Sequence, residues 1–314
     1  MSMNAVPLLK PRAVLPRSTL AVISPASYPQ LEKVERAIAV LEEQGYRVKR
    51  GEHLLSRMEP YFAGSSAERL ADLHSAFADP EVAGIVCSRG GYGSNYLLEG
   101  LDLELVRANP KPLLGYSDLS TLQTWLLDRV GLVGFQGPML SGDFARENGV
   151  DLSILSKVLS GDRVTYGASE GLRTLRPGKA SGVLYGGCLS ILVAAMGTRF
   201  APQTEGKLLF LEDVSAKPYQ VDRMLRQMLL GGKLDGVAGV IFGEMLDCVS
   251  QAAGFKLLED VILRVLKDLK VPIAIGLRSG HVSHANVTLP LGIRAELNLE
   301  GEPLLQMQEP AVHA

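Results

Sequence analysis

The chain has 314 residues, of which 46% are hydrophobic, so it is long and apolar enough for two domains of ordinary size. Its 32 basic and 34 acidic residues nearly cancel, and no run of five basic residues occurs. This balance argues against a nucleic-acid groove or an anionic membrane surface as partner. The three cysteines (Cys87, Cys188 and Cys248) are far apart and form no CxxC pair, so neither a disulfide framework nor a zinc knuckle is indicated.

The N-terminal stretch, residues 1–18, is interrupted by prolines and charges and lacks the continuous apolar segment of a secretion signal. The most apolar later stretch, residues 184–197, is shorter than the roughly 20 residues that a membrane-spanning helix needs. We therefore expect a cytoplasmic protein without a membrane segment.

From Thr19 onward, short apolar runs alternate with segments of helical periodicity. In residues 28–46, apolar side chains recur three or four positions apart, and Gly45 supplies a stop signal. Continuous apolar strands separated by amphipathic helices are typical of a parallel sheet covered on both faces. The pattern predicts a doubly wound α/β domain over residues 15–150, with strands in residues 19–24, 82–88, 112–117 and 132–138 and helices in residues 28–46, 67–80, 94–101 and 118–131.

A polar, glycine-rich stretch follows, and we interpret residues 151–181 as a linker region that contains one short helix, residues 151–159. A second domain of β/α type is predicted over residues 182–308. Its C-terminal part, residues 287–300, has the pattern of a hairpin or meander. Strands are also expected in residues 207–213, 236–244 and 272–277, and helices near residues 186–197 and in residues 218–230 and 255–270.

Two segments of the first domain follow strands, at the edge where functional groups gather in open α/β sheets. One is the glycine-rich loop RGGYG, residues 89–93. It fits a tight turn, an anion cradle of backbone N–H groups, or an oxyanion hole for acyl transfer. The loop is not GxGxxG and no P-loop lysine and serine follow it, so a nucleotide site is not favoured.

Ser117 is the other residue at this edge, at the change from the strand PLLGYS to the helix DLSTLQTW. The ordinary interpretation is that Ser117 or Asp118 caps the helix. The functional interpretation is a nucleophile on a sharp strand-to-helix turn, with the N–H of Asp118 facing a tetrahedral oxygen. The motif is not the GxSxG of α/β-hydrolases, because Leu119 stands where the last glycine belongs.

A serine nucleophile needs a base and a group that orients the base. His281 and His284 lie in a polar loop after a predicted strand, whereas the other three histidines fall on a strand edge, in a helix and in the tail (His53, His74 and His313). Glu212 and Asp213 end an apolar strand, where carboxylates are costly without a partner. The competing interpretations are solvated loop histidines and a helix cap formed by Asp213.

Several long and distinctive blocks follow one another between Ala21 and Gly292: YFAGSSAERLADLHSAFADPEVAGIVCSRGGYGSNYLL, PLLGYSDLS, GFQGPM, LLFLEDVSAKPYQVDRML and SGHVSHANVTLPLG. In these blocks and in their order the chain resembles the LD-carboxypeptidases, the family of serine peptidases that contains the muramoyltetrapeptide carboxypeptidases. The resemblance implies a flavodoxin-like N-terminal domain, a swivelling C-terminal β/α domain and a homodimer.

The resemblance also assigns roles to residues. It implies Ser117 as nucleophile, His281 as base and Glu212 as the acid that orients it, without a metal or other cofactor. Backbone N–H groups of Gly91 and Asp118 would form the oxyanion hole. Arg89 is a candidate for binding the substrate carboxylate, with a structural ion pair as the equal alternative.

The implied reaction is removal of the terminal D-alanine from murein tetrapeptide during peptidoglycan recycling. A second possibility keeps the triad and changes the substrate, because some relatives are microcin-immunity peptidases that cleave aminoacyl-nucleotide toxins. A third possibility, from another class, is a two-domain binding protein without catalysis. The residues themselves leave open whether the third residue of the stem peptide is diaminopimelate or lysine, and whether the peptide carries a sugar or nucleotide.

Overall fold

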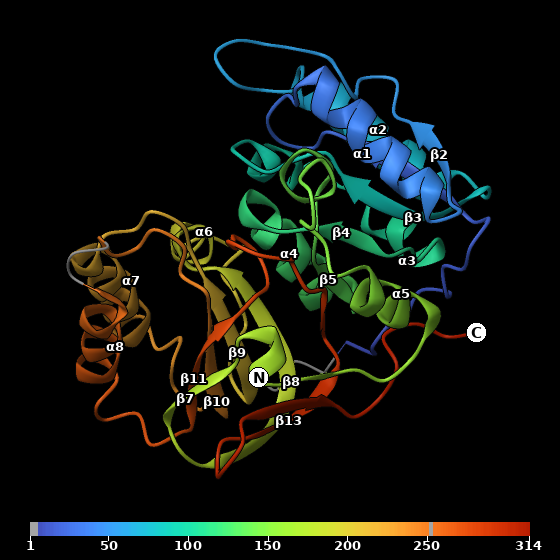
Figure 1. Cartoon of the computed structure of the whole chain (residues 1–314). Helices are drawn as coiled ribbons and strands as arrows, with labels where there is room; N and C mark the ends of the chain where they lie inside the picture. The colour runs from blue at the N-terminus through green and yellow to red at the C-terminus, as the bar shows by residue number, and fades with distance from the viewer. Residues whose placement is uncertain (1–5, 251–253) are drawn as a thin grey trace.

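The computed structural model describes residues 6–250 and 254–314, which form two lobes, each built around one β-sheet (Figure 1). Residues 1–5, the start of the N-terminal stretch that lacks the pattern of a secretion signal, lie outside the described residues. Among the described helices, none combines the length and the apolar character needed to cross a bilayer.

The first sheet has six strands in the order β12-β5-β4-β3-β1-β2. The five strands β1 to β5 are parallel, and their order 2-1-3-4-5 is that of flavodoxin-like sheets. The predicted doubly wound N-terminal fold is therefore confirmed. The strands are β1 (Thr19–Ile23), β2 (Arg47–Arg50), β3 (Val82–Cys87), β4 (Leu113–Gly115), β5 (Gly134–Gln136) and β12 (Leu289–Leu291).

Local signals set the ends of the helices between these strands. Helix α2 begins at a capping box, in which the Ser65 hydroxyl accepts from the N–H of Glu68 and the Glu68 carboxylate accepts from the N–H of Ser65. Helix α4 ends at Gly131, whose φ of 80° is left-handed. The helices are α1 (Leu31–Glu43), α2 (Ser66–Ala78), α3 (Leu103–Ala108) and α4 (Ser120–Val130), with short turns η1 (Ser94–Leu97), η2 (Ser117–Leu119) and η3 (Leu140–Phe144).

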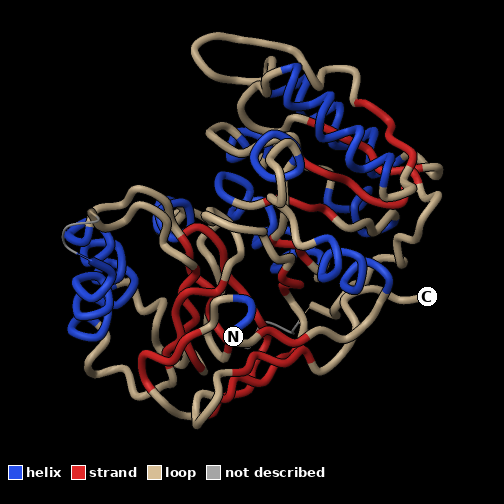
Figure 2. The backbone as a smooth tube through the Cα atoms, in the orientation of Figure 1, coloured by secondary structure: helices blue, strands red, loops and turns tan. Residues whose placement is uncertain are grey.

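The second sheet has eight strands in the order β6-β14-β13-β8-β9-β10-β11-β7. The central strands β8 to β11 are parallel, and the flanking strands are antiparallel. Helices α7 and α8 lie together on the side turned away from the first lobe (Figures 1 and 2). The elements are α5 (Leu152–Ser160), β6 (Thr165–Tyr166), η4 (Ala168–Glu170), β7 (Arg173–Arg176), β8 (Lys179–Cys188), α6 (Leu189–Ala194), β9 (Lys207–Glu212), α7 (Pro218–Leu230), β10 (Gly239–Gly243), α8 (Gly254–Val265), β11 (Ile273–Leu277), β13 (Arg294–Asn298) and β14 (Leu304–Met307).

Three segments differ from the pattern expected of them. The proposed linker, residues 151–181, contains the expected helix α5 but also β6 and β7, which pair at the two edges of the second sheet. The segment near residues 186–197 is helical only over Leu189–Ala194, because its first residues belong to β8, whose glycines allow close approach to β9. Residues 287–300 form no hairpin: β12 joins the first sheet beside β5, and β13 joins the second. The domain limits drawn from the sequence stay predictions.

The centre of β9 should dominate the stability of the second lobe. Leu209 is 0% exposed between β8 and β10, and we expect Leu209→Ala to lower the free energy of unfolding by about 2–5 kcal/mol, because it leaves a cavity that the sheet cannot close. Leu230, at the end of α7, is 74% exposed, so Leu230→Ala should stay within about 0.5 kcal/mol of the parent. Urea unfolding of both variants measures the difference, and equal losses would contradict this core assignment.

Candidate active site

Ser117 lies directly after β4, on a turn that leads through η2 into α4. Its φ of 65° is left-handed, a conformation that is costly for a residue with a side chain. The position before α4 is Leu119, and no side chain makes a cap hydrogen bond there. The helix-cap interpretation of Ser117 and Asp118 is therefore wrong. A partly exposed serine on a strained strand-to-helix turn is the arrangement typical of a nucleophile.

Asp118 ties this turn to the glycine-rich loop. Its buried carboxylate accepts from the N–H of Ser94 at 2.7 Å, and the Ser94 hydroxyl donates to the Asp118 carbonyl at 2.6 Å. Burial raises the pKa of Asp118, while the hydrogen bonds from Ser94 and Gly93 and the charge of Arg69 oppose that rise. The paired bonds hold the end of loop 89–93 against the turn that carries Ser117.

The glycines of the loop leave room beside Ser117. A Cβ on Gly90 would lie 2.9 Å from the Ser117 Cβ and 3.3 Å from the Asp118 nitrogen. Gly91 has a φ of 98°, and a Cβ there would lie 2.5 Å from the Ser27 hydroxyl. Within residues 6–250 and 254–314, the N–H groups of Gly91 and Asp118 have no hydrogen-bond acceptor. Two unpaired donors beside a serine can receive a developing oxyanion.

Glu212 and His281 meet from the end of a strand and from a loop of the second lobe. Glu212 ends β9 and is 0% exposed, and its Oε2 accepts from Nδ1–H of His281 at 2.7 Å and from the His281 backbone N–H at 3.0 Å. We assign the Nδ1–H tautomer from this bond, which leaves Nε2 as a proton acceptor. Gly280 makes the contact possible, because a Cβ there would lie 2.6 Å from the Glu212 Cδ.

The other two candidates from the sequence, Asp213 and His284, form hydrogen bonds elsewhere. Asp213 accepts from the N–H of Ser190, in the first turn of α6, and from the N–H of Val214, so its assignment as the cap of α7 is wrong. His284 is exposed. Its carbonyl, rather than its ring, is engaged, and accepts from Arg146 at 2.7 Å.

The pKa of His281 lies above the usual 6.5. Burial favours the neutral ring and lowers the pKa, but the charge of Glu212 and its hydrogen bond outweigh burial, with further contributions from Asp213 and Asp143. The ring is thus suited to accept a proton close to neutral pH.

Ser117 and His281 line one cavity of about 260 Å³. No hydrogen bond joins the Ser117 hydroxyl to the His281 ring in the part of the chain that the structure describes, although such bonds often tighten only when substrate is bound. Arg89, Lys33 and Gly91 line the same cavity. Arg89 donates only a long bond of 3.4 Å to the Tyr28 carbonyl and, like Lys33, forms no ion pair with a described carboxylate.

Sequence reasoning missed several residues that line this cavity, among them Lys33 and Tyr116. Lys33 reaches it from α1, and only its helical position among charged neighbours could have drawn attention to it. Tyr116 packs its ring against His281 with the centroids 5.0 Å apart and the planes at 88°. Its place directly before Ser117 was the available signal.

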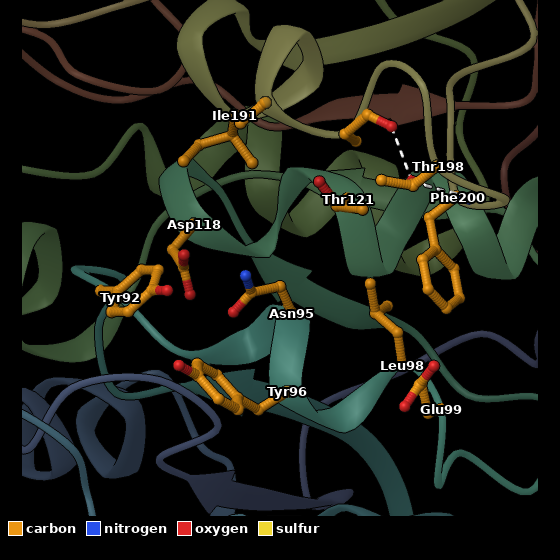
Figure 3. Close-up of a pocket in the computed structure, with 12 residues that line it drawn as sticks. Tyr92, Asn95, Tyr96, Leu98, Glu99, Asp118, Thr121, Ile191, Thr198 and Phe200 are labelled. Atoms are coloured by element: carbon orange, nitrogen blue, oxygen red, sulfur yellow. Dashed lines mark hydrogen bonds between the residues drawn. The ribbon is translucent and has the colours of Figure 1, made fainter.

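A second cavity of about 400 Å³ lies between η1 of the first lobe and α6 of the second (Figure 3). Tyr92 and Asp118 stand at one end of it, and Leu98, Glu99 and Phe200 at the other. Its lining includes two carboxylates but no lysine, arginine or histidine. The two cavities adjoin the same loop, and their linings differ in charge: the first has two cationic side chains, and the second has two carboxylates, of which Glu99 also pairs with Arg199 at 3.3 Å.

Family models match the two halves of the chain separately. One, described as the LD-carboxypeptidase N-terminal domain, matches residues 20–137, and another, the LD-carboxypeptidase C-terminal domain, matches residues 181–297. The chain is 40% identical to a probable murein peptide carboxypeptidase of Bacillus subtilis, over 92% of this chain and 91% of that one. It is 25% identical to the microcin C7 self-immunity protein MccF of Escherichia coli, over 89% of each.

The fold agrees with these matches. The crystal structure of a muramoyltetrapeptide carboxypeptidase from Oxalobacter formigenes superposes with a TM-score of 0.82 at 28% identity, over 95% of this chain and all of the other. The chain belongs to the LD-carboxypeptidase family. It is an enzyme, a hydrolase with carboxypeptidase activity, and the interpretation as a binding protein without catalysis is wrong.

The contact between Glu212 and His281 predicts how the ring titrates. NMR titration should place the pKa of His281 above 6.5 in the parent, and Glu212→Gln should lower this pKa, because burial then lacks its main opposing charge. Asp213→Asn should change it less, since Asp213 makes no hydrogen bond to the ring. A parent value at or below 6.5, or a value unchanged in Glu212→Gln, would contradict the assignment.

Proposed function

We propose that the chain is a serine-type LD-carboxypeptidase that removes the terminal D-alanine from murein tetrapeptide in peptidoglycan recycling. One observation carries the proposal: Ser117 shares a cavity with His281, and the His281 ring is hydrogen-bonded to Glu212. Ser117 lies on a left-handed turn, beside two N–H groups that have no acceptor among the described residues. Serine acyl transfer requires a nucleophile, a base and a group that orients the base. The names of the Bacillus and Oxalobacter relatives support a murein peptide as substrate.

The reaction proceeds in two acyl transfers. The Ser117 Oγ attacks the carbonyl carbon that precedes D-alanine while Nε2 of His281 takes the hydroxyl proton. The N–H groups of Gly91 and Asp118 bind the oxyanion of the tetrahedral intermediate. His281 then protonates the leaving amine, the C–N bond breaks and D-alanine departs. Water, deprotonated by His281, cleaves the remaining acyl ester by the same route and frees the serine.

The cationic cavity would bind the leaving D-alanine. A carboxypeptidase must recognise a free carboxylate close to the bond it cuts, and Arg89 and Lys33 line the cavity that holds Ser117 without a carboxylate partner among the described residues. Arginine presents a planar pair of donors that matches a carboxylate. We assign Arg89 to this carboxylate, with Lys33 as a second positive charge.

The second cavity would take the other side of the scissile bond. Its apolar and aromatic walls and its two carboxylates, Glu99 and Asp118, fit an aliphatic side chain that ends in an ammonium group. Of the two options for the third residue of the stem peptide, lysine ends in an ammonium group alone, whereas diaminopimelate carries a carboxylate beside its ammonium group. The different charges of the two cavity linings would orient the peptide across Ser117.

A microcin-immunity activity is the second candidate, because the chain also resembles the self-immunity protein MccF over most of its length. Such an activity would use the same triad on an aminoacyl-nucleotide. Turnover on murein tetrapeptide and on an aminoacyl-sulfamoyl adenylate separates the two candidates. Cleavage of the adenylate with an inert tetrapeptide would overturn the murein proposal.

We also propose that the enzyme is a cytoplasmic homodimer with the domain limits drawn from the sequence. The family resemblance supports the dimer and the location. Light scattering on the purified chain tests the dimer, and cell fractionation tests the location. Limited proteolysis tests the domain limits, which require a first cut between residues 151 and 181.

Ser117→Ala should abolish release of D-alanine, with kcat reduced on the order of 10⁶-fold, since the oxyanion donors alone cannot form an acyl-enzyme. The release of D-alanine is measured by mass spectrometry of L-Ala-γ-D-Glu-diaminopimelyl-D-Ala incubated with each protein. Ser141→Ala is the matched control, because Ser141 lines the same cavity without a proposed role. D-Alanine release by Ser117→Ala at the parental rate would refute the nucleophile.

Arg89→Gln should lower kcat/KM on the tetrapeptide by about 10-fold, because an exposed cation contributes about 1.5 kcal/mol to a carboxylate contact. On a tetrapeptide that ends in D-alaninamide, the parent and the variant should agree within about twofold. Arg57→Gln, an exposed arginine that packs on Tyr28 outside the cavity lining, is the control. An equal loss on acid and amide substrates would argue against a carboxylate contact.

A further inference from the structure

The loop that carries His281, residues 278–288 (the histidine loop), is attached to the first lobe by an arginine. Arg146 donates from Nη1 to the Val282 carbonyl at 3.0 Å and from Nη2 to the His284 carbonyl at 2.7 Å. Val282 directly follows His281 in the chain. One guanidinium therefore holds the backbone immediately after the imidazole.

Arg146 is itself fixed by the first lobe. It follows η3, and the Asp143 carboxylate of that turn lies 3.9 Å from its Nη2. Asp143 is buried and accepts from the N–H of Met139 at 2.9 Å. Arg36 of α1 donates to the Ala145 carbonyl at 3.2 Å, so the segment before Arg146 is also held from α1.

His281 is held from both lobes. Glu212 binds its Nδ1 from the second lobe, and Tyr116, the residue before Ser117, packs against its ring from the first. Nucleophile and base therefore sit on different lobes, and their separation depends on the contacts that join the lobes at this loop. A misplacement of about 1 Å between reacting groups can cost about 100-fold in rate.

We infer that Arg146 is a positioning residue, which sets the approach of His281 to Ser117 by joining the histidine loop to the first lobe. Its planar guanidinium is suited to the task, because two parallel donors reach two carbonyls at once, whereas a lysine would reach one at a time. Arg146 does not line the cavity with Ser117, so it acts through His281 and not on the substrate.

The loop would stay folded without this arginine. Asn286 is 0% exposed and closes the loop on itself, accepting from the Gly280 N–H at 3.1 Å and donating to the Gly280 carbonyl at 3.0 Å. Its backbone N–H donates to the Gly149 carbonyl, and its carbonyl accepts from Asp151. Loss of Arg146 should therefore displace His281 without unfolding the loop.

The test uses the full chain and a fluorophosphonate probe, which is independent of peptide binding. In this reaction the Ser117 Oγ bonds to phosphorus, fluoride leaves and His281 takes the proton. Arg146→Ala should slow labelling of Ser117 by about 100-fold, and Arg146→Lys by less. Added guanidinium at millimolar concentration should restore part of the rate in Arg146→Ala only. On the tetrapeptide, kcat should fall while KM changes by less than about twofold.

Arg176→Ala is the matched control, because it also removes a guanidinium that donates to two backbone carbonyls, those of Leu266 and Leu269, but it makes no bond to the histidine loop. It should label at the parental rate at a comparable melting temperature. Equal slowing in Arg176→Ala and Arg146→Ala, parental labelling in Arg146→Ala, or no guanidinium rescue would overturn the inference.

The inference rests on the proposed serine chemistry, and the two can fail separately. If the parent protein is labelled at Ser117 but releases no D-alanine, the proposed murein substrate is wrong and the role of Arg146 is unaffected. A parent that is not labelled at Ser117 would overturn both.

Discussion

The site depends on one buried contact, the hydrogen-bonded pair of Glu212 and His281. A carboxylate at 0% exposure is tolerated only with close partners, and Oε2 has two of them, both from His281. Among the described residues, its other oxygen, Oε1, has no hydrogen-bond partner. The histidine loop must therefore fold onto the end of β9, and only a glycine at position 280 permits the approach. Removing either partner would leave an uncompensated group at the junction of the lobes.

The first lobe supplies the complementary half of the site through backbone geometry. Its strained turn at Ser117 and its glycine-rich loop are held together by the reciprocal bonds between Asp118 and Ser94. The donors of the proposed oxyanion hole are therefore fixed before a substrate arrives, which is the condition under which such donors lower a barrier. The distance between nucleophile and base then depends on how the two lobes are joined.

The sequence was sufficient for the elements with strong periodicity and for the strand ends at which the candidate site lies. The flavodoxin-like order follows from alternating apolar strands and amphipathic helices, and Glu212 could be singled out because a carboxylate ends an apolar run. The sequence was insufficient where contacts between residues far apart in the chain determine the structure. Asp213 accepts from an N–H in the first turn of α6 and does not cap α7. The segments that form β6 and β7 were predicted to be linker, because these two edge strands are short and polar. Arg146 has no local signal, since its partners lie more than 130 positions away.

The path of β12 bears on how this architecture could have evolved. After the histidine loop the chain returns to the first lobe, adds a strand beside β5, and only then completes the second sheet with β13 and β14. A chain ending near residue 150 would leave β5 as a bare edge, open to pairing with other molecules. The two halves recognised by separate family models are therefore interlaced. A new partner domain could not be acquired by simple end-to-end gene fusion, and specificity would have to diversify through loops and side chains instead.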